Sequence, residues 1–430
     1  MIRRCRLSEI SLDQILCRDI RAEKNVDAVV DEIIADVRAN GDAALLRYAE
    51  RFDHARLDAL EVAPEEIDAA WARVDEAFRQ TLELARDNIR EFHRHQIQEN
   101  FVITGKNGTV MGQRYQPIEK VGLYVPGGTA SYPSTVLMDA IPAKLAGVRE
   151  LTMVTPPAPD GSITDAILAA AKAAGVDRIF KTGGAQAVAA LAYGTQSVPR
   201  VDKIVGPGNV YVATAKRKVF GQVAIDMIAG PSEILVLADD GCDARCVAAD
   251  MLSQAEHDRL ATAVLVTTSE RLADEVEEEL ERQLALLPRE AIARESIETN
   301  GKIVLCSDMD EAVRAANAIA PEHLELCVEE PFALLDRIVN AGSIFLGRNV
   351  PEALGDYLAG PNHTLPTSGT ARFSSPLSVD DFVKKSSFLY YSKEALGEVC
   401  KNVALFARTE GLEAHARSIE SRFQETEDEQ

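Results

Sequence analysis

From residue 121 onward, the sequence repeats a short apolar run, a turn rich in glycine and a helical stretch. The pattern is clearest over residues 121–232, where "VGLYV", "LTMVT", "RIFKT" and "DKIV" each precede a segment with helical periodicity. Short apolar runs between turns favour buried strands, and apolar residues at three-to-four spacing favour helices. Strands that alternate with helices build βαβ units on a parallel sheet. The region therefore predicts an α/β block.

A second series of the same kind follows Ser232. The runs "EILVLAD", "ATAVLVTT", "KIVLC", "LELCV" and "SIFLG" alternate with helical stretches up to residue 347. We therefore predict two α/β blocks with mostly parallel strands. The first hundred residues and the last fifty have helical periodicity instead. Before the first block, "FVITGKNGTVMGQRYQPIEK" is predicted to form a hairpin that turns at Asn107-Gly108.

Composition restricts the class of protein. The chain has 430 residues, of which 46% are hydrophobic, so it can form two or three domains with sizeable cores. The formal net charge of −22 argues against a nucleic-acid or anionic-membrane surface. No apolar run is long enough to span a bilayer, and the N-terminus lacks the apolar core of a signal peptide. We expect a soluble, cytoplasmic protein that binds neither nucleic acid nor membranes.

Cysteine and histidine are scarce, with seven residues of each. The cysteines form no Cys-x-x-Cys pair, so the sequence predicts neither a disulfide framework nor a thiolate zinc site. His93 and His95 are two residues apart and would point away from each other on a helix. We expect both to be surface residues and not metal ligands.

Four glycine-containing turns follow predicted strands, in "YVPGGTA", "KTGGAQA", "IVGPGNV" and "MIAGPSE". Glycine lets the backbone approach a ligand closely, and a helix N-terminus behind it suits a phosphate group. None is a complete Gly-x-Gly-x-x-Gly motif, and a tight turn needs glycine even without a ligand. Turns after parallel strands gather at one sheet edge, so four of them favour a nucleotide site.

Two polar pairs are candidates for chemistry. Gln254 and His257 are three residues apart at the end of a predicted helix and share one face, either as a polar helix end or as half of a metal site. Glu322 and His323 precede a predicted strand, where they could transfer protons or belong to a solvated loop. Cys327 is expected to be a buried strand residue and not a nucleophile.

The segment over residues 352–378 lacks helical or strand periodicity and is predicted to be a long loop. Loops of that length in compact domains are usually functional or disordered, and this one contains Asp356 and His363. Near the end of the chain, Glu410 and His415 are further candidates, although His415 could simply face solvent on a helix.

Together, Gln254, His257, Asp356 and His415 would make a nitrogen and oxygen ligand set without sulfur. Zinc accepts imidazole and carboxylate ligands, whereas glutamine is a weak, neutral ligand. A site with one weak ligand suits the binding of substrate atoms at open positions. Sequence spacing alone does not bring these four residues together.

Eight stretches resemble those of the histidinol dehydrogenases, in order and from about residue 25 to about residue 423. They are "YVPGGTASYPSTVLM", "GGAQAVAALAYGT", "KIVGPGNVYVATAKR", "DMIAGPSE", "LSQAEHD", "APEHLE", "GDYLAGPNHTLPT" and "EGLEAHARSI". The resemblance implies NAD-linked oxidation of L-histidinol to L-histidine through L-histidinal, the last two steps of histidine biosynthesis. It also implies one Zn²⁺ per active site and a homodimer.

The resemblance assigns roles to individual residues, and none of these positions departs from the family pattern. The zinc ligands would be Gln254, His257, Asp356 and His415, and the proton acceptors would be Glu322 and His323. The zinc ligands and His323 would contact the substrate together with Ser232, His363 and Glu410. The NAD site would include Tyr124, Gln186 and Asn209.

The resemblance also implies two incomplete Rossmann-like domains with helical N- and C-terminal segments. Residues 1–20 would form an N-terminal segment. Residues 21–123 and 233–377 would form a discontinuous α/β domain, into which residues 124–232 are inserted as the domain on the NAD side. Residues 378–430 would form a helical tail that crosses to the partner subunit, so that the active sites are shared.

The chemistry of such a reaction agrees with these residues. An alcohol that becomes an acid loses two hydrides, and water must add to the intermediate aldehyde. We assign His323 to accept the hydroxyl proton, Glu322 to activate the water, and zinc to orient the substrate. The alternatives are a related zinc- and NAD-dependent dehydrogenase of another small hydroxylated substrate, a metal-dependent hydrolase, and an inactive nucleotide-binding protein.

Overall fold

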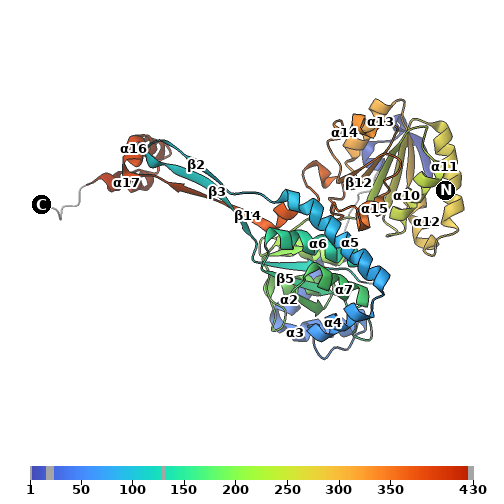
Figure 1. Cartoon of the computed structure of the whole chain (residues 1–430), viewed down its shortest axis with the longest axis horizontal. Coiled ribbons are helices and arrows are strands. Elements are labelled where there is room, and N and C mark those ends of the chain that lie inside the picture. The colour runs from blue at the N-terminus through green and yellow to red at the C-terminus, as the bar shows by residue number, and fades with distance from the viewer. Residues whose placement is uncertain (1, 16–23, 128–130, 425–430) are drawn as a thin grey trace. The chain divides into compact units, whose positions relative to one another are not determined.

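The computed structural model describes residues 2–15, 24–127 and 131–424, and Cys17 lies outside these ranges. The chain divides into two compact units (Figure 1). The first comprises Met1–Ile97 and Ile118–Phe382, and the second comprises Gln98–Pro117 and Val383–Gln430. Over the described residues, the first unit contains a five-stranded and a six-stranded parallel sheet covered by helices. The α/β fold with βαβ units predicted from the sequence is confirmed.

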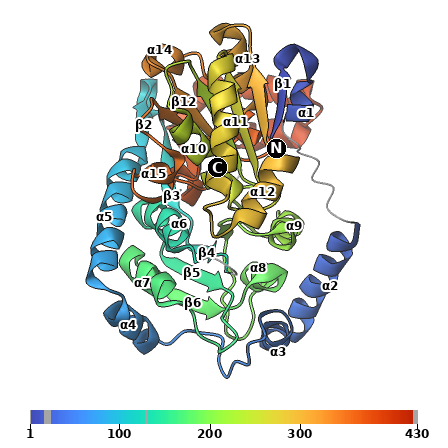
Figure 2. The same cartoon turned by 90° about the vertical axis from the view of Figure 1, so that its right-hand side faces the viewer.

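The five-stranded sheet has the strand order β6-β5-β4-β7-β8. Its strands are β4 (Lys120–Tyr124), β5 (Glu150–Thr155), β6 (Arg178–Lys181), β7 (Lys203–Val205) and β8 (Ala224–Ile225). The connecting helices are α6 (Pro133–Ala146), α7 (Asp165–Ala174), α8 (Gly184–Tyr193) and α9 (Val210–Val219). Successive strand residues face opposite sides, and an apolar core lies on each face, one with α6 and α7 and the other with α8 and α9 (Figure 2).

The N-terminal helices complete these two cores. They are α2 (Lys24–Asn40), α3 (Asp42–Tyr48), α4 (Pro64–Arg73) and α5 (Glu76–His93). Helices α4 and α5 pack with α6 and α7, and α2 and α3 pack with α8 and α9. We expected residues 21–123 to belong with residues 233–377, but these helices pack against the five-stranded sheet. Periodicity shows that a helix has an apolar face, and not which sheet that face contacts. The domain boundaries themselves stay a prediction.

The six-stranded sheet has the strand order β1-β11-β10-β9-β12-β13, and all neighbouring strands are parallel. The strands are β1 (Arg3–Arg6), β9 (Glu233–Ala238), β10 (Thr262–Thr267), β11 (Lys302–Leu305), β12 (His323–Cys327) and β13 (Ser343–Leu346). The nine apolar runs quoted from both α/β blocks all form strands. Residues 3–6, expected to lie in a separate N-terminal segment, instead form an edge strand of this sheet.

Helices cover both faces of the six-stranded sheet, which explains why its strands are apolar almost throughout. These helices are α1 (Leu12–Ile15), α10 (Ala244–Ala255), α11 (Glu270–Leu284), α12 (Glu290–Thr299), α13 (Met309–Ile319), α14 (Pro331–Leu335) and α15 (Glu352–Tyr357). Shorter elements are η1 (Leu7–Glu9), η2 (Ala49–Asp53), η3 (Arg94–Gln96), η4 (Lys106–Gly108), η5 (Thr370–Arg372), η6 (Val379–Phe382) and η7 (Ser421–Phe423). In the described ranges, we find no helix with the length and apolar content needed to cross a membrane.

Two local expectations were wrong. The segment 352–378, predicted to be a loop throughout, begins with the short helix α15, which carries Asp356. His93, expected at the surface, is fully buried on α5, and its Nδ1 donates a 2.7 Å hydrogen bond to the side-chain oxygen of Gln96. It extends the buried stripe of α5 at helical spacing, after Leu82, Ala85 and Ile89. His95 is exposed, as expected.

The second unit contains an antiparallel sheet of β2 (Phe101–Thr104), β3 (Val110–Pro117) and β14 (Val383–Tyr390), in the order β14-β3-β2. Its helices are α16 (Lys393–Thr409) and α17 (Glu413–Glu420). The hairpin turn at Asn107-Gly108 is confirmed, with φ angles of 53° and 74°. We expected residues 378–430 to be helical, but β14 pairs along its whole length with β3. This pairing depends on a partner that is remote in the sequence.

Candidate functional site

The candidate site lies at the amino-terminal edge of the six-stranded sheet, where β9 and β12 begin. Ser232 directly precedes β9, and Glu322 directly precedes β12, which begins at His323. The two strands are hydrogen-bonded neighbours, with His323 opposite Ile234. Ala320, with a φ of 50°, ends α13 in the left-handed region and directs the chain toward β12. The starts of both strands therefore lie together.

The hydrogen bonds of His323 define its tautomer. Its Nδ1 lies 3.0 Å from the carbonyl oxygen of Glu233, and because a carbonyl can only accept, Nδ1 carries the proton. Burial lowers the pKa of His323, so the ring is neutral and Nε2 has a free electron pair. Nε2 has no hydrogen-bond partner in the described part of the chain and lies 3.8 Å from both Glu352 Oε1 and Asp356 Oδ1. This nitrogen is available to accept a proton.

Glu322 is the second candidate base, and it is buried beside His323. Its Oε2 accepts a 2.8 Å hydrogen bond from the backbone N–H of Glu233 and lies 3.7 Å from His323 Nδ1. Burial raises the pKa of Glu322 well above its ordinary value, and the negative charges of Glu233 and Asp356 raise it further. A carboxylate with a raised pKa binds a proton more strongly and is therefore a better general base.

Gln254 and His257 lie at the end of α10 and face the same region. In the amide orientation that satisfies both of its ends, Gln254 accepts from the backbone N–H of Glu233 at 3.0 Å. Its nitrogen then lies 3.2 Å from His257 Nδ1 and contacts Glu352 Oε1. The structure thus brings the two residues together, as their spacing predicted, and joins them to the start of β9.

Asp356 and His363 come from α15 and the segment that follows it. His363 Nδ1 donates to the backbone carbonyl of Asp356 at 3.1 Å, so the free electron pair of its neutral ring is on Nε2. Burial lowers the pKa of His363. Ligand atoms of His323, Glu352 and Asp356 all lie within 4.8 Å of one another. Asp356 therefore lies close to His323 and Glu352.

The donors in this region fit a divalent metal ion of the zinc type. Gln254, His257 and Asp356 offer nitrogen and oxygen atoms, which zinc accepts. Glu322, Glu352 and Asp356 place several carboxyl groups in one largely buried volume, and burial raises the pKa of both glutamates well above the ordinary value. A bound cation would offset the repulsion between these groups.

The residues assigned to NAD lie at the carboxyl edge of the five-stranded sheet. Tyr124 ends β4, and its buried hydroxyl accepts from the backbone N–H of Gly184 at 2.9 Å. Gln186 is buried in the first turn of α8, and Asn209 caps α9 by accepting from two backbone N–H groups at 3.1 and 3.2 Å. Gly206 has a φ of 109°, and a Cβ there would clash with the Tyr124 carbonyl oxygen. These residues follow three different strands, β4, β6 and β7, of one parallel sheet.

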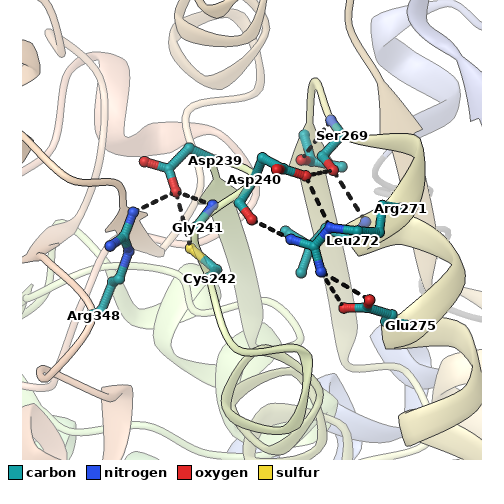
Figure 3. Close-up of polar contacts among 10 residues, drawn as sticks. Asp239, Asp240, Gly241, Cys242, Ser269, Arg271, Leu272, Glu275 and Arg348 are labelled. Atoms are coloured by element: carbon teal, nitrogen blue, oxygen red, sulfur yellow. Dashed lines mark hydrogen bonds and ion pairs between the residues drawn. The ribbon is translucent and has the colours of Figure 1, made fainter.

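The carboxyl edge of the six-stranded sheet is occupied by the chain's own polar contacts (Figure 3). Asp239, which follows β9, accepts from Arg348 at 2.7 Å. Asp240 accepts from Ser269 and Arg271, whose guanidinium also pairs with a glutamate on α11. Open α/β sheets commonly bind ligands at this edge. Here its ion pairs are satisfied internally, whereas the candidate site lies at the opposite edge.

The thiol of Cys327 does not add a nucleophile to the site. Cys327 is buried at the carboxyl end of β12, whereas His323 begins the strand. The neighbouring Cys242 thiol and burial both raise the pKa of Cys327, which disfavours the reactive thiolate. This agrees with the structural role that we expected for Cys327.

Comparison with known proteins shows which family the chain belongs to. The family model for histidinol dehydrogenase matches residues 17–423. The chain is 57% identical to the histidinol dehydrogenase of Syntrophotalea carbinolica over 97% of both chains. It is 56% identical to that of Geobacter sulfurreducens over 95% of this chain and 96% of the relative. The chain belongs to the histidinol dehydrogenase family. The crystal structure of histidinol dehydrogenase from Elizabethkingia anophelis is similar, with a TM-score of 0.93, 38% identity and 98% coverage of both chains.

The family resemblance inferred from the eight sequence stretches is thereby confirmed. Sequence reasoning nevertheless missed one residue of this region, Glu352. Glu352 is buried, contacts Gln254 and accepts from Ser253 at 3.1 Å. It precedes Asp356 by four residues, so both face one side of a helix. The spacing was visible in the sequence, but the segment was interpreted as a loop.

Two predicted site residues belong to the second unit. Glu410 is the C-cap of α16, and His415 lies in the first turn of α17. Both side chains are exposed in the single chain, so the described contacts of the cluster around His323 come from the first unit. The assignment of Glu410 and His415 to the active site stays a prediction.

Proposed function

We propose that the protein is a zinc- and NAD-dependent histidinol dehydrogenase that oxidises L-histidinol to L-histidine through L-histidinal, in the last steps of histidine biosynthesis. The observation that carries the proposal is the buried, neutral His323 with a free Nε2, beside Glu322 and the carboxyl groups of Glu352 and Asp356. Two successive oxidations with an intervening hydration require two general bases and a group that orients the substrate. Two candidate bases and a candidate metal site lie at one edge of the six-stranded sheet.

His323 is proposed to accept the hydroxyl proton of histidinol at Nε2. The ring would become positively charged, and the bond from Nδ1–H to the Glu233 carbonyl, now 3.0 Å long, would stabilise that charge. The carboxylates of Glu352 and Asp356, each 3.8 Å from Nε2, would stabilise it further. Glu322 is proposed to remove a proton from the water that adds to histidinal.

The metal would be held by Gln254, His257 and Asp356 from one chain and by His415 of the partner subunit. When bound, zinc supplies a positive charge that orients the imidazole and amino nitrogens of the substrate. We propose that Ser232, His363 and Glu410 complete the substrate site. His363 can present only Nε2 to the substrate, because its Nδ1–H is occupied by the Asp356 carbonyl.

NAD, one molecule of which accepts a hydride in each of the two oxidations, is proposed to bind at Tyr124, Gln186 and Asn209. The glycine-containing turns at this sheet edge support the proposal, because dinucleotides bind where such turns let their backbone approach the phosphates. The buried Tyr124 hydroxyl is held by Gly184, at the N-terminus of α8.

We propose a cytoplasmic homodimer whose second unit completes the active site of the neighbouring subunit. The exposed surface of this unit supports the proposal, because large apolar side chains on an isolated chain indicate a protein interface. The most exposed are Val102 (59%), Leu389 (73%), Tyr390 (61%), Leu405 (67%) and Phe406 (74%).

The experiment that tests the function follows NADH absorbance after purified protein is mixed with L-histidinol and NAD. We expect two NADH per histidinol at completion, because both oxidation steps reduce one NAD each. One NADH per histidinol would contradict the four-electron reaction. No NADH with histidinol, but NADH with another small alcohol, would instead favour the related dehydrogenase.

A further inference from the structure

A buried ion pair lies directly behind the turn that carries Asn209. Lys216 on α9 and Asp226 after β8 form this pair, and their side chains are 2% and 1% exposed. Lys216 Nζ donates to the carbonyl oxygen of Gly206 at 2.9 Å. Asp226 accepts from the backbone N–H of Gly206 at 2.8 Å through Oδ2, and from that of Met227 at 2.6 Å through Oδ1. Both backbone polar groups of Gly206 are thus held by the same ion pair.

The ion pair fixes the backbone conformation at Gly206 more than it stabilises the fold. Burying two charges has a large desolvation penalty, and well-packed apolar side chains at such positions are often equally stabilising. What apolar side chains cannot do is hold a backbone N–H and a backbone carbonyl in fixed positions. Gly206 also has little freedom on its other side, where a Cβ would clash with the Tyr124 carbonyl oxygen and lie 3.0 Å from Asp139 Oδ2.

The position of this clamp in the sheet matters for ligand binding. From β4 the chain proceeds through β5 to β6 on one side, and β7 and β8 lie on the other side of β4. The turns after β4 and β7 therefore flank the point at which the strand order reverses. In open α/β sheets, ligands bind at this point. Gly206 follows β7, and residues 206–209 lead directly to the N-cap of α9.

We propose that Lys216 and Asp226 are positioning residues for the dinucleotide site. They hold residues 206–209, here named the cofactor turn, in the conformation that presents Asn209 to NAD. The inference rests on the proposed function, since it takes from there the assignment of Asn209 to NAD. Lys216 and Asp226 contact the turn and act on the dinucleotide only through it.

The test separates positioning from stability with single and double substitutions. Lys216→Met leaves the Asp226 carboxylate buried and unpaired, and should lower both thermal stability and NADH affinity. The double variant Lys216→Met/Asp226→Leu removes both charges and should regain most of the thermal stability. We expect its NADH dissociation constant, measured by fluorescence titration, to stay raised by about tenfold or more, because the hydrogen bonds to Gly206 are gone.

Two further measurements make the outcome specific. At saturating NAD, the KM for histidinol should change less than about twofold in the double variant, whereas the KM for NAD should rise with the NADH dissociation constant. The matched control is Lys218→Met, which removes a half-buried lysine of the same helix that pairs with Asp31 at 2.8 Å. It should leave NADH affinity unchanged.

A double variant that regains NADH affinity together with stability would overturn the positioning role, as would equal increases in both KM values. If the wild-type protein itself fails to bind NADH, the proposed function fails and not this inference alone. If the Lys216→Met variant does not fold, the double variant still tests the positioning role. The double variant should fold, because it leaves neither charge of the pair buried without its partner.

Discussion

Asp139 offers a quantitative test of how buried charge affects this fold. It lies on α6 with no exposed surface, and its Oδ1 accepts a 3.0 Å hydrogen bond from Thr364. Its Oδ2 has no partner within the described residues. Burial, together with the negative charge of Asp226, raises the pKa of Asp139 to about 8. The folded protein therefore keeps this carboxyl group protonated at neutral pH, whereas the unfolded chain releases the proton near pH 4.

The sign of the effect follows from proton binding. Because the folded pKa of Asp139 is raised, folding takes up a proton between about pH 4 and pH 8, and stability falls as the pH rises through this window. Asp139→Asn keeps an oxygen for Thr364 and cannot ionise. Relative to the wild type, the variant should gain about 1.4 kcal/mol at pH 5 and about 4 kcal/mol at pH 7, at about 1.4 kcal/mol per pH unit.

The assay is urea unfolding of both proteins at pH 5, 6 and 7, with the difference in unfolding free energy plotted against pH. A difference that does not grow with pH would refute the reasoning. Asp165→Asn is the control, because its partner Arg73 lowers the pKa of Asp165 through a hydrogen bond. The wild-type advantage over this variant should be lost toward low pH and should not follow the Asp139 profile.

Three further predictions concern the active site. Glu322→Gln should lower the rate of oxidation of supplied histidinal by about 10²–10⁴-fold, far more than the rate of oxidation of histidinol to histidinal. Equal losses in both rates would mean that Glu322 does not serve the water and His323 the hydroxyl proton separately. Removal of zinc with a strong chelator should abolish activity but leave the far-ultraviolet helical signal, because the apolar cores do not depend on the metal, and loss of that signal would contradict this. The variants His257→Ala and His415→Ala should each be inactive, but their co-expression should recover roughly a quarter of wild-type activity. Half of the dimers then contain one chain of each variant, and one of the two active sites in such a dimer is intact. Activity near zero in the mixture would mean that the tail completes the site of its own chain.

The elements of both α/β blocks could be predicted from the sequence because each apolar run is short, continuous and separated from the next by a helix. The pairing of remote segments could not. The sequence "RRCR" at residues 3–6 is too short and basic to indicate a strand, and it becomes one only because β11 has a free edge. Residues 383–390 contain two lysines and two serines, and their strand conformation depends on β3.

The candidate site was predictable where a local motif carried the chemistry. The three-residue spacing of Gln254 and His257 placed them on one helical face, and their side chains do approach each other. The spacing of Glu352 and Asp356 was visible in the sequence, but the contact of Glu352 with Gln254 depends on α15 packing beside α10. The tautomer of His323 was equally inaccessible, since it depends on the backbone carbonyl of Glu233 in a neighbouring strand.

The construction of the second unit has a consequence for synthesis on the ribosome. The hairpin of β2 and β3 ends at Pro117, and its third strand begins at Val383. At about 5–20 residues per second, translation of the intervening segment takes on the order of tens of seconds. During that time the whole first unit can emerge and fold, while β3 keeps an unpaired edge beside exposed apolar residues such as Val102 and Ile103. The nascent chain therefore carries an aggregation-prone hairpin until its last fifty residues appear.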